Sequence, residues 1–114
     1  MKAPIPDISR DLFDLTGYCS IVTGASVGIG LKIAEALARR GSDLVLVSRN
    51  AEHLEEAAAK VRAIGRRVVA VATDVADADA PERIVAAALG LGGRIDVLVN
   101  NAGFMTFSDP FNVN

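Results

Sequence analysis

Residue types on which many kinds of functional site depend are nearly absent from this 114-residue sequence. It has one cysteine, one histidine, one tyrosine and no tryptophan. A single cysteine excludes an intramolecular disulfide and a thiolate metal cluster, and the apolar neighbours of Cys19 predict a buried, inert thiol. His53 has neither a second histidine nor a serine-centred nucleophile turn beside it, which argues against a metal site and a hydrolase triad.

The sequence also lacks an excess of positive charge and a long apolar run. Lys and Arg number 12 and Asp and Glu number 14, for a net charge of −2, so we expect no nucleic-acid or anionic-membrane partner. No stretch approaches the ~18 apolar residues of a membrane helix. The first ten residues have no apolar core like that of a signal peptide. We therefore expect a cytoplasmic protein in which residues 1–10 are flexible.

Hydrophobic residues, in contrast, make up 51% of the chain, and their spacing alternates between two periods. Short β-prone runs predict four strands, over residues 18–23, 43–48, 68–72 and 95–99. The second run, Asp-Leu-Val-Leu-Val-Ser, is almost continuously apolar. This pattern is typical of a strand covered on both faces, as in a parallel sheet.

Helical periodicity fills the three intervals between these runs. The first helix begins at Gly28 and stops at Gly41. The second has Asn50 as its N-cap and ends at Gly65. The third has Asp79 as its cap, a proline two residues later, and a cluster of glycines at 90, 92 and 93 that breaks it. The apolar residues that share one face are Ile29, Ile33, Ala34, Leu37 and Ala38 in the first helix and Leu54, Ala57, Ala58 and Val61 in the second, and the third helix carries Ile84, Val85 and Ala88.

The order β-α-β-α-β-α-β with short connections predicts the α/β class. Such alternation produces a parallel sheet with right-handed crossovers and helices on its faces. No internal repeat and no linker divides the chain, so we expect one domain over residues 1–114.

A glycine-rich turn, residues 24–30, lies between the first strand and the first helix. Gly24, Gly28 and Gly30 permit a tight turn and a close approach of backbone N–H groups to a diphosphate. The helix N-terminus adds a partial positive charge. No lysine follows the last glycine, so this is not a nucleoside-triphosphate loop. The spacing Gly-x-x-x-Gly-x-Gly also departs from the commoner Gly-x-Gly-x-x-Gly, and a plain strand-to-helix turn remains the alternative.

The second strand ends in Ser48-Arg49, where a dinucleotide fold meets the adenosine ribose. Folds that prefer NAD place a carboxylate there for the 2′-hydroxyl, and this chain has none. An arginine fork can hold a 2′-phosphate through charge-assisted hydrogen bonds, and Ser48 can donate another. We predict NADP over NAD, with a solvated loop arginine as the alternative.

Two further loops follow strands at the same edge of the sheet. Asp74 could accept from the adenine amino group while Val75 packs on the ring, although an ordinary turn aspartate is a competing interpretation. Asn100 and Asn101 directly follow the fourth strand, and their amides need partners there. They could tie this loop to the glycine turn, face a ligand, or form a turn with no ligand role.

Together these motifs resemble the short-chain dehydrogenase/reductase family, over about residues 11–103. The motifs that carry the resemblance are Thr23-Gly24-(three residues)-Gly28-Ile29-Gly30, then Asp74-Val75, then Asn100-Asn101-Ala102-Gly103. The resemblance implies a Rossmann-like sheet of strand order 3-2-1-4, the first four strands of a larger doubly wound domain.

The resemblance also implies a role for each matching position. The diphosphate and its ribose would be held by Gly24, Ser26, Gly28, Ile29 and Gly30. Arg49 falls at the position that selects NADP, with Ser48 before it. Asp74 and Val75 would frame the adenine. The nicotinamide-side ribose would be bordered by Asn101, Ala102 and Gly103, while Asn100 and Thr23 help to hold the strands together.

Two departures from the family pattern limit what this chain can do. Val27 stands where many NADP-preferring relatives have Lys or Arg. The family's catalytic Tyr-x-x-x-Lys pair is missing, because the only tyrosine, Tyr18, is followed four residues later by Val22. We therefore assign no catalytic residue and predict that the chain alone is inactive.

The sequence thus favours the NADP-binding N-terminal half of an oxidoreductase that transfers hydride between a nicotinamide and a carbonyl or alcohol. The three phenylalanines at 104, 107 and 111, with no element after them to cover them, suggest a domain incomplete at its C-terminal end. A stand-alone NADP-binding or regulatory module, or a non-functional fragment, are the alternatives. The complete enzyme is expected to form a homo-oligomer.

Overall fold

The computed structural model describes residues 12–101, and within them strands and helices alternate. The strands are β1 (Cys19–Thr23), β2 (Asp43–Ser48), β3 (Val68–Ala72) and β4 (Val97–Val99), and the helices are α2 (Gly28–Arg39), α3 (Ala51–Arg62) and α4 (Ala80–Gly92). All three strand pairs are parallel, in the order β3-β2-β1-β4. The predicted α/β class and the strand order 3-2-1-4 are confirmed.

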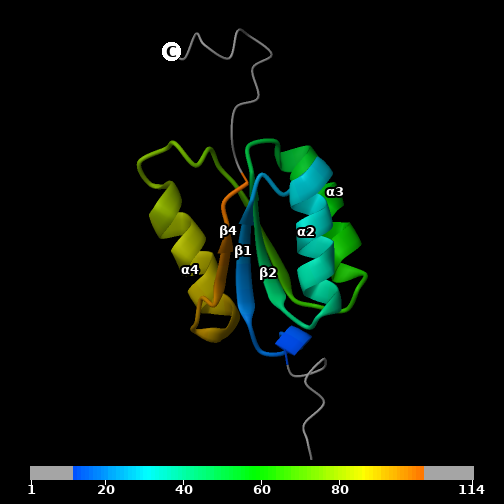
Figure 1. Cartoon of the computed structure of the whole chain (residues 1–114). Helices are drawn as coiled ribbons and strands as arrows, with labels where there is room; N and C mark the ends of the chain where they lie inside the picture. The colour runs from blue at the N-terminus through cyan, green and yellow to red at the C-terminus, as the bar shows by residue number, and fades with distance from the viewer. Residues whose placement is uncertain (1–11, 102–114) are drawn as a thin grey trace, which may run out of the picture.

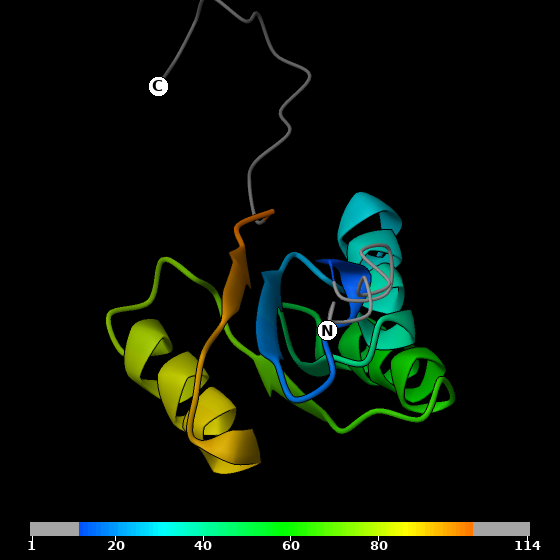
Figure 2. The same cartoon turned by 60° about the horizontal axis from the view of Figure 1, so that its bottom comes forward.

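Helices cover both faces of this sheet (Figures 1 and 2). On one face α2 and α3 pack through Ala34, Ala38, Leu54 and Val61 onto Leu44 and other residues of the central strands. On the other face a second core cluster joins α4 to the strands through Ala80, Ile84, Ala88 and Leu91. Every residue of β1 is buried, as are the first five of β2, which agrees with the continuous apolar run of the second strand.

The helix boundaries follow the expected signals in part. Asn50 is the N-cap of α3, where its Oδ1 accepts from the backbone N of His53 at 3.0 Å. Asp79 occupies the cap position of α4, but its side chain makes no capping hydrogen bond. Gly90 does not break α4, which continues to Gly92 and ends at Gly93 in the left-handed conformation. Of the three glycines at 90, 92 and 93, only Gly93 has a positive φ, 74°, which favours glycine.

Some expected apolar positions face solvent instead of the sheet. Ile29 is 72% exposed, because α2 places Gly30 and the alanines at 34 and 38 against the strands. Val85 of α4 is 41% exposed, beside the buried Ile84. The fourth strand is also shorter than predicted and begins at Val97. Helical periodicity identifies an apolar stripe, but the neighbouring elements decide which part of the stripe is covered.

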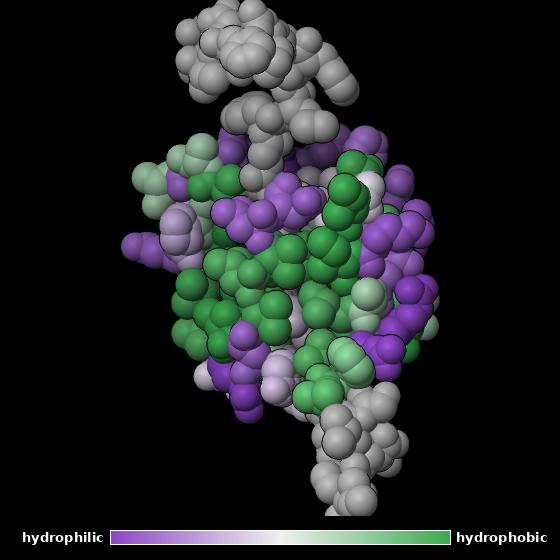
Figure 3. Space-filling view, viewed as in Figure 1, coloured by the Kyte–Doolittle hydropathy of each residue, from purple (hydrophilic) through white to green (hydrophobic). Residues whose placement is uncertain are grey.

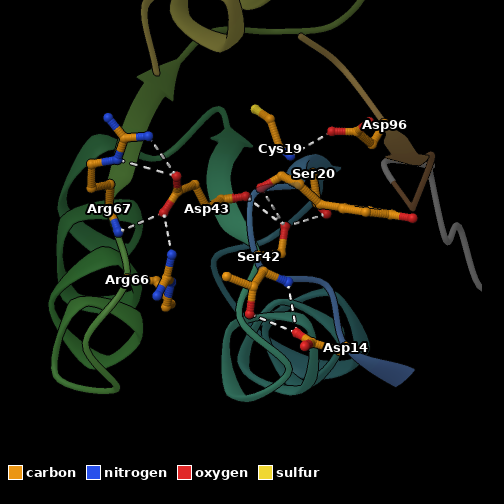
Figure 4. Close-up of polar contacts among 10 residues, drawn as sticks. Asp14, Cys19, Ser20, Ser42, Asp43, Arg66, Arg67 and Asp96 are labelled. Carbon is orange, nitrogen blue, oxygen red and sulfur yellow. Dashed lines mark hydrogen bonds and ion pairs between the residues drawn. The ribbon is translucent and has the colours of Figure 1, made fainter. Parts of the chain in front are cut away.

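Polar contacts tie the strands together at the ends where they begin (Figure 4). The Asp43 carboxylate, which is buried, accepts from Nε, Nη2 and the backbone N of Arg67 and from Nη2 of Arg66. Burial by itself would raise the pKa of Asp43, but the hydrogen bonds and charges of these arginines bring it below its ordinary value. The contacts thereby fix the start of β2 to the chain entering β3.

A second set of contacts links β1 to its other neighbour. The backbone N of Cys19 donates to Oδ2 of Asp96 at 2.9 Å, and Arg94 pairs with the same carboxylate. The hydrogen bond from Arg94, followed by that from Cys19, lowers the pKa of Asp96. Burial, and then the charges of Asp43 and Asp96, raise the pKa of the Cys19 thiol. The prediction that Cys19 is buried is confirmed.

Candidate dinucleotide site

A pocket of about 400 Å³ opens where β1, β2 and β3 end and the chain turns back into the helices. This is the edge of a doubly wound sheet at which ligands bind. The residues that line it are Gly24, Ser26, Val27, Val47, Ser48, Arg49, Thr73, Asp74, Val75, Ala76 and Asn101. They come from the end of β2 and from the loops that follow the four strands, and seven of them belong to the site predicted from the sequence.

The glycine turn forms one wall of the pocket. Gly24 and Gly28 have φ angles of 62° and 61°, a backbone region that side chains disfavour. At Gly30 the backbone φ is ordinary, but space is not available: a Cβ would lie 2.1 Å from the carbonyl oxygen of Gly24 and 2.7 Å from Nδ2 of Asn101. Gly30 itself lies behind the turn, and its small size lets α2 approach the turn closely.

The N-terminus of α2 points its first backbone N–H groups toward this turn. Its N-cap residue, Val27, is in extended conformation and contributes no side-chain hydrogen bond, and its first turn has no acidic residue. No protein carboxylate of that turn therefore competes for the helix dipole or the unpaired N–H donors. Such an end suits the diphosphate group of a dinucleotide.

Two hydroxyls and a guanidinium lie together at the end of β2. Ser48 Oγ donates to Ser26 Oγ at 3.0 Å, which connects the end of β2 to the glycine turn. The next residue, Arg49, is exposed and lines the same pocket. The three side chains offer hydrogen-bond donors and one positive charge on one side of the pocket.

The loop after β3 also lines the pocket. Asp74 Oδ1 accepts from the backbone N of Ala76 at 2.9 Å, so the carboxylate organises its own turn as well as lining the pocket. Val75 is 42% exposed at the pocket surface. The backbone N of Thr73 donates to the carbonyl of Ser48 at 3.0 Å and holds this loop beside β2.

Asn101 joins the end of β4 to the glycine turn. Its backbone N donates to Oγ1 of Thr23 at 3.0 Å, and its Nδ2 donates to the carbonyl of Gly24 at 3.2 Å. Thr23 Oγ1 also lies 3.3 Å from Oδ1 of Asn100. The asparagine pair therefore ties the loop to the turn, which is one of the interpretations that the sequence left open.

Not every predicted residue lies at the pocket. Gly28, Ile29 and Gly30 do not line it, although they form the turn and helix end beside it. Ala102 and Gly103 lie outside the described residues, as do residues 1–10. Four residues, Val27, Val47, Thr73 and Ala76, line the pocket without having been predicted as site residues, and only their places at strand ends or in the loops that follow could have indicated them. Over residues 12–101, no group of His, Cys, Asp or Glu side chains is placed to hold a metal ion.

The model of the short chain dehydrogenase family matches residues 19–113. The chain belongs to this family. Gluconate 5-dehydrogenase of Gluconobacter oxydans is 48% identical over 93 residues, which are 82% of this chain and 36% of that relative. The L-sorbose reductase of Gluconobacter frateurii, crystallised with NADPH and L-sorbose, is 37% identical and superposes with a TM-score of 0.80 over 90% of this chain and 39% of its own. A putative short-chain alcohol dehydrogenase of Sinorhizobium meliloti is 45% identical, with a TM-score of 0.79 and similar coverage.

This short-chain dehydrogenase chain spans only a third to two fifths of the length of these relatives. The described part contains the sheet edge with its pocket but no Tyr-x-x-x-Lys pair. Tyr18 lies at the other end of β1, 37% exposed, with the Arg94 guanidinium 5.6 Å from its ring centre. Tyr18 therefore lies at the opposite end of β1 from the pocket and does not line it. No described helix is long and apolar enough to cross a membrane.

Proposed function

We propose that this chain is the NADP-binding portion of a short-chain oxidoreductase that transfers hydride between the nicotinamide and a carbonyl or alcohol. The observation that carries the proposal is the shared pocket of Ser26, Ser48 and Arg49 at the end of β2, which holds no acidic side chain from that strand end. A carboxylate there would favour the ribose hydroxyls of NAD, whereas an arginine and two hydroxyls favour a 2′-phosphate.

The other sides of the pocket suit the remaining parts of the cofactor. The uncapped N-terminus of α2 and the backbone N–H groups of the glycine turn would hold the diphosphate. Val75 would offer an apolar surface to the adenine, and the second carboxylate oxygen of Asp74 would accept from its amino group. Asn101, followed by Ala102 and Gly103, would border the nicotinamide ribose. NADPH in the L-sorbose reductase that this chain resembles supports the same cofactor class.

When bound, the nicotinamide supplies or accepts the hydride. This chain's residues position the cofactor and contribute no general acid, so turnover would depend on residues that the family places beyond this segment. We propose a cytoplasmic enzyme, homo-oligomeric when complete. A stand-alone NADP-binding module remains the second candidate, because the described residues form the pocket without help from any further element.

Thermal unfolding with and without cofactor tests this function. We expect NADP at 100 times its Kd to stabilise the chain by about 2.7 kcal/mol, and NAD at the same concentration to stabilise it much less. No shift with either nucleotide would overturn cofactor binding and favour a non-functional fragment.

The Arg49→Ala variant tests the preference for NADP over NAD separately from the binding of either nucleotide. We expect the wild-type chain to bind NADP at least about tenfold more tightly than NAD, and the variant to lose most of this preference because one charge-assisted pair contributes about 1.5–3 kcal/mol. Calorimetric titration with both nucleotides measures it. Lys60→Ala, which removes an exposed charge on α3 outside the pocket, is the matched control and should leave both affinities unchanged. Equal affinities for NADP and NAD in the wild type would contradict the proposal.

A further inference from the structure

Two carbonyl groups of β3 point away from the rest of the sheet. In the described part of the chain β3 is an edge strand that pairs with β2 alone. The backbone N of Thr73 donates to a carbonyl of β2, and the carbonyl of Arg67 accepts from a backbone N of β2. Because successive residues of a strand direct their backbone groups alternately to either side, the carbonyls of Val68 and Ala72, at the two ends of β3, face outward and need other partners.

Two arginines of the adjoining helices donate to these outward carbonyls. Nη2 of Arg62 in α3 lies 3.0 Å from the Val68 oxygen, and Nη2 of Arg83 in α4 lies 3.3 Å from the Ala72 oxygen. Figure 1 shows α4 running back along the sheet from the loop that follows β3. The two contacts are chemically alike, but Arg62 acts where β3 begins, whereas Arg83 acts where β3 ends beside the pocket.

The peptide bond between Ala72 and Thr73 leads directly into the pocket-lining residues 73–76. Its N–H donates to the carbonyl of Ser48, and its carbonyl accepts from Arg83. Beyond this peptide, Asp74 organises the turn through bonds to the backbone N atoms of the second and third residues after it, both at 2.9 Å. The orientation of the whole turn therefore depends on a peptide that is held on both of its sides.

The surroundings of Arg83 favour a directed hydrogen bond over a long-range effect of its charge. Arg83 is exposed, and Figure 3 shows hydrophilic residues beside the N-terminal turn of α4, whereas hydrophobic residues cover the region of β4. Water and salt screen an exposed charge. Arg83 is also the only cation in residues 68–93, a segment with four carboxylates, Asp74, Asp77, Asp79 and Glu82.

We propose that Arg83 is a positioning residue for the adenine side of the pocket. By holding the Ala72 carbonyl, it fixes the peptide from which Asp74 and Val75 extend into the pocket wall. The inference rests on the proposed function, in which these two residues frame the adenine. NADP and NAD share the adenine, so Arg83 acts on both nucleotides alike, in contrast to an arginine that selects the 2′-phosphate.

Hydrogen exchange of the cofactor-free chain tests the positioning itself. In Arg83→Met, which keeps an apolar stem but no donor, we expect the amides of Thr73, Ala76 and Asp77 to exchange at least about threefold faster, with β1 amides unchanged. Arg62→Met is the matched control: it removes the equivalent bond at the start of β3 and should leave these three amides as in the wild type. No acceleration in Arg83→Met, or equal acceleration in both variants, would overturn the inference. Since no nucleotide is present, this result is independent of the proposed function.

Calorimetric titration then tests the consequence for binding. We expect Arg83→Met to weaken NADP and NAD by the same factor, about threefold to fivefold, so that the ratio of the two affinities stays that of the wild type. Arg83→Lys keeps a donor of similar reach and should recover most of the affinity, and Arg62→Met should bind as the wild type does. A larger loss for NADP than for NAD would show that Arg83 acts by its charge on the additional phosphate. Unchanged affinities with a lower unfolding midpoint would show a role in stability alone. Either result would overturn the inference, whereas a wild-type chain that binds neither nucleotide would overturn the proposed function and the adenine role with it.

Discussion

Gly30→Ala is expected to destabilise the fold by about 3 kcal/mol and to abolish cofactor binding. The added Cβ would lie 2.1 Å from the Gly24 carbonyl oxygen and 2.8 Å from its carbon, and backbone atoms cannot rotate away as a flexible side chain can. Relief therefore requires α2 to move off the turn. That movement would disturb both the Asn101–Gly24 hydrogen bond and the helix end that faces the pocket.

This loss of stability would occur even though a helix intrinsically favours Ala over Gly by about 1 kcal/mol. The steric cost of the added Cβ must therefore exceed that preference. Thermal unfolding of the variant should show a midpoint lower by roughly 12 °C or more. Gly90→Ala is the matched control, because Gly90 is also helical but a Cβ there would meet nothing within 4 Å. The control should be unchanged or slightly more stable. Similar midpoints for both variants would show that the close approach at Gly30 has no energetic importance.

The sequence predicts well those features that depend on neighbouring residues. Asn50 caps α3 through a contact with a backbone three residues on, so its own position carries the signal. The α/β class and the parallel sheet follow from the alternation of periods, whereas the strand order follows only from the family resemblance that the motifs at the strand ends carry. The glycine turn and the serine and arginine after β2 converge on one pocket because parallel strands all end at the same edge.

The sequence does not predict features that depend on contacts between residues far apart in the chain. The need for glycine at position 30 arises from Gly24 and Asn101, which only the folded sheet brings together. The hydroxyl pair of Ser26 and Ser48 joins residues 22 positions apart. Thr73 lines the pocket beside the predicted Asp74, and its backbone N donates to the carbonyl of Ser48, a residue on another strand.

For the same reason, the sequence does not predict which apolar residues of the helices are exposed. The apolar spacing of Ile29, Ile33 and Leu37 predicts one buried stripe, but Ile29 faces water beside the pocket. Val85 is apolar yet 41% exposed, whereas its neighbour Ile84 on α4 is buried against the sheet. Periodicity reports how apolar a face is, and it does not report what lies opposite that face.

Asp43→Asn should lower the free energy of unfolding at neutral pH by about 2–3 kcal/mol. The side chain of Asp43 is 7% exposed and pairs with Arg67 at 2.8 Å and Arg66 at 3.4 Å, while Arg67 Nε and its backbone N donate to the same carboxylate. An asparagine can accept at one oxygen but carries no charge, so both arginines lose their ionic partner. Arg67 is 64% exposed and regains water, which keeps the loss below that of a fully buried pair.

The pH dependence of this loss of stability tests whether it comes from the charge of the Asp43 carboxylate. The pKa of Asp43 is lower in the folded chain than the ordinary value of about 3.9, so the carboxylate binds fewer protons folded than unfolded. Its contribution is complete above about pH 5 and is lost as the pH falls through 3.9 toward the folded pKa. Urea unfolding from pH 7 to pH 3 should therefore show a constant difference between wild type and Asp43→Asn down to about pH 5, and a shrinking one below. Glu56→Gln, on the exposed face of α3, is the control and should follow the wild-type curve. A difference that stays constant to pH 3 would mean that the carboxylate acts through shape and hydrogen bonding and that its charge contributes nothing.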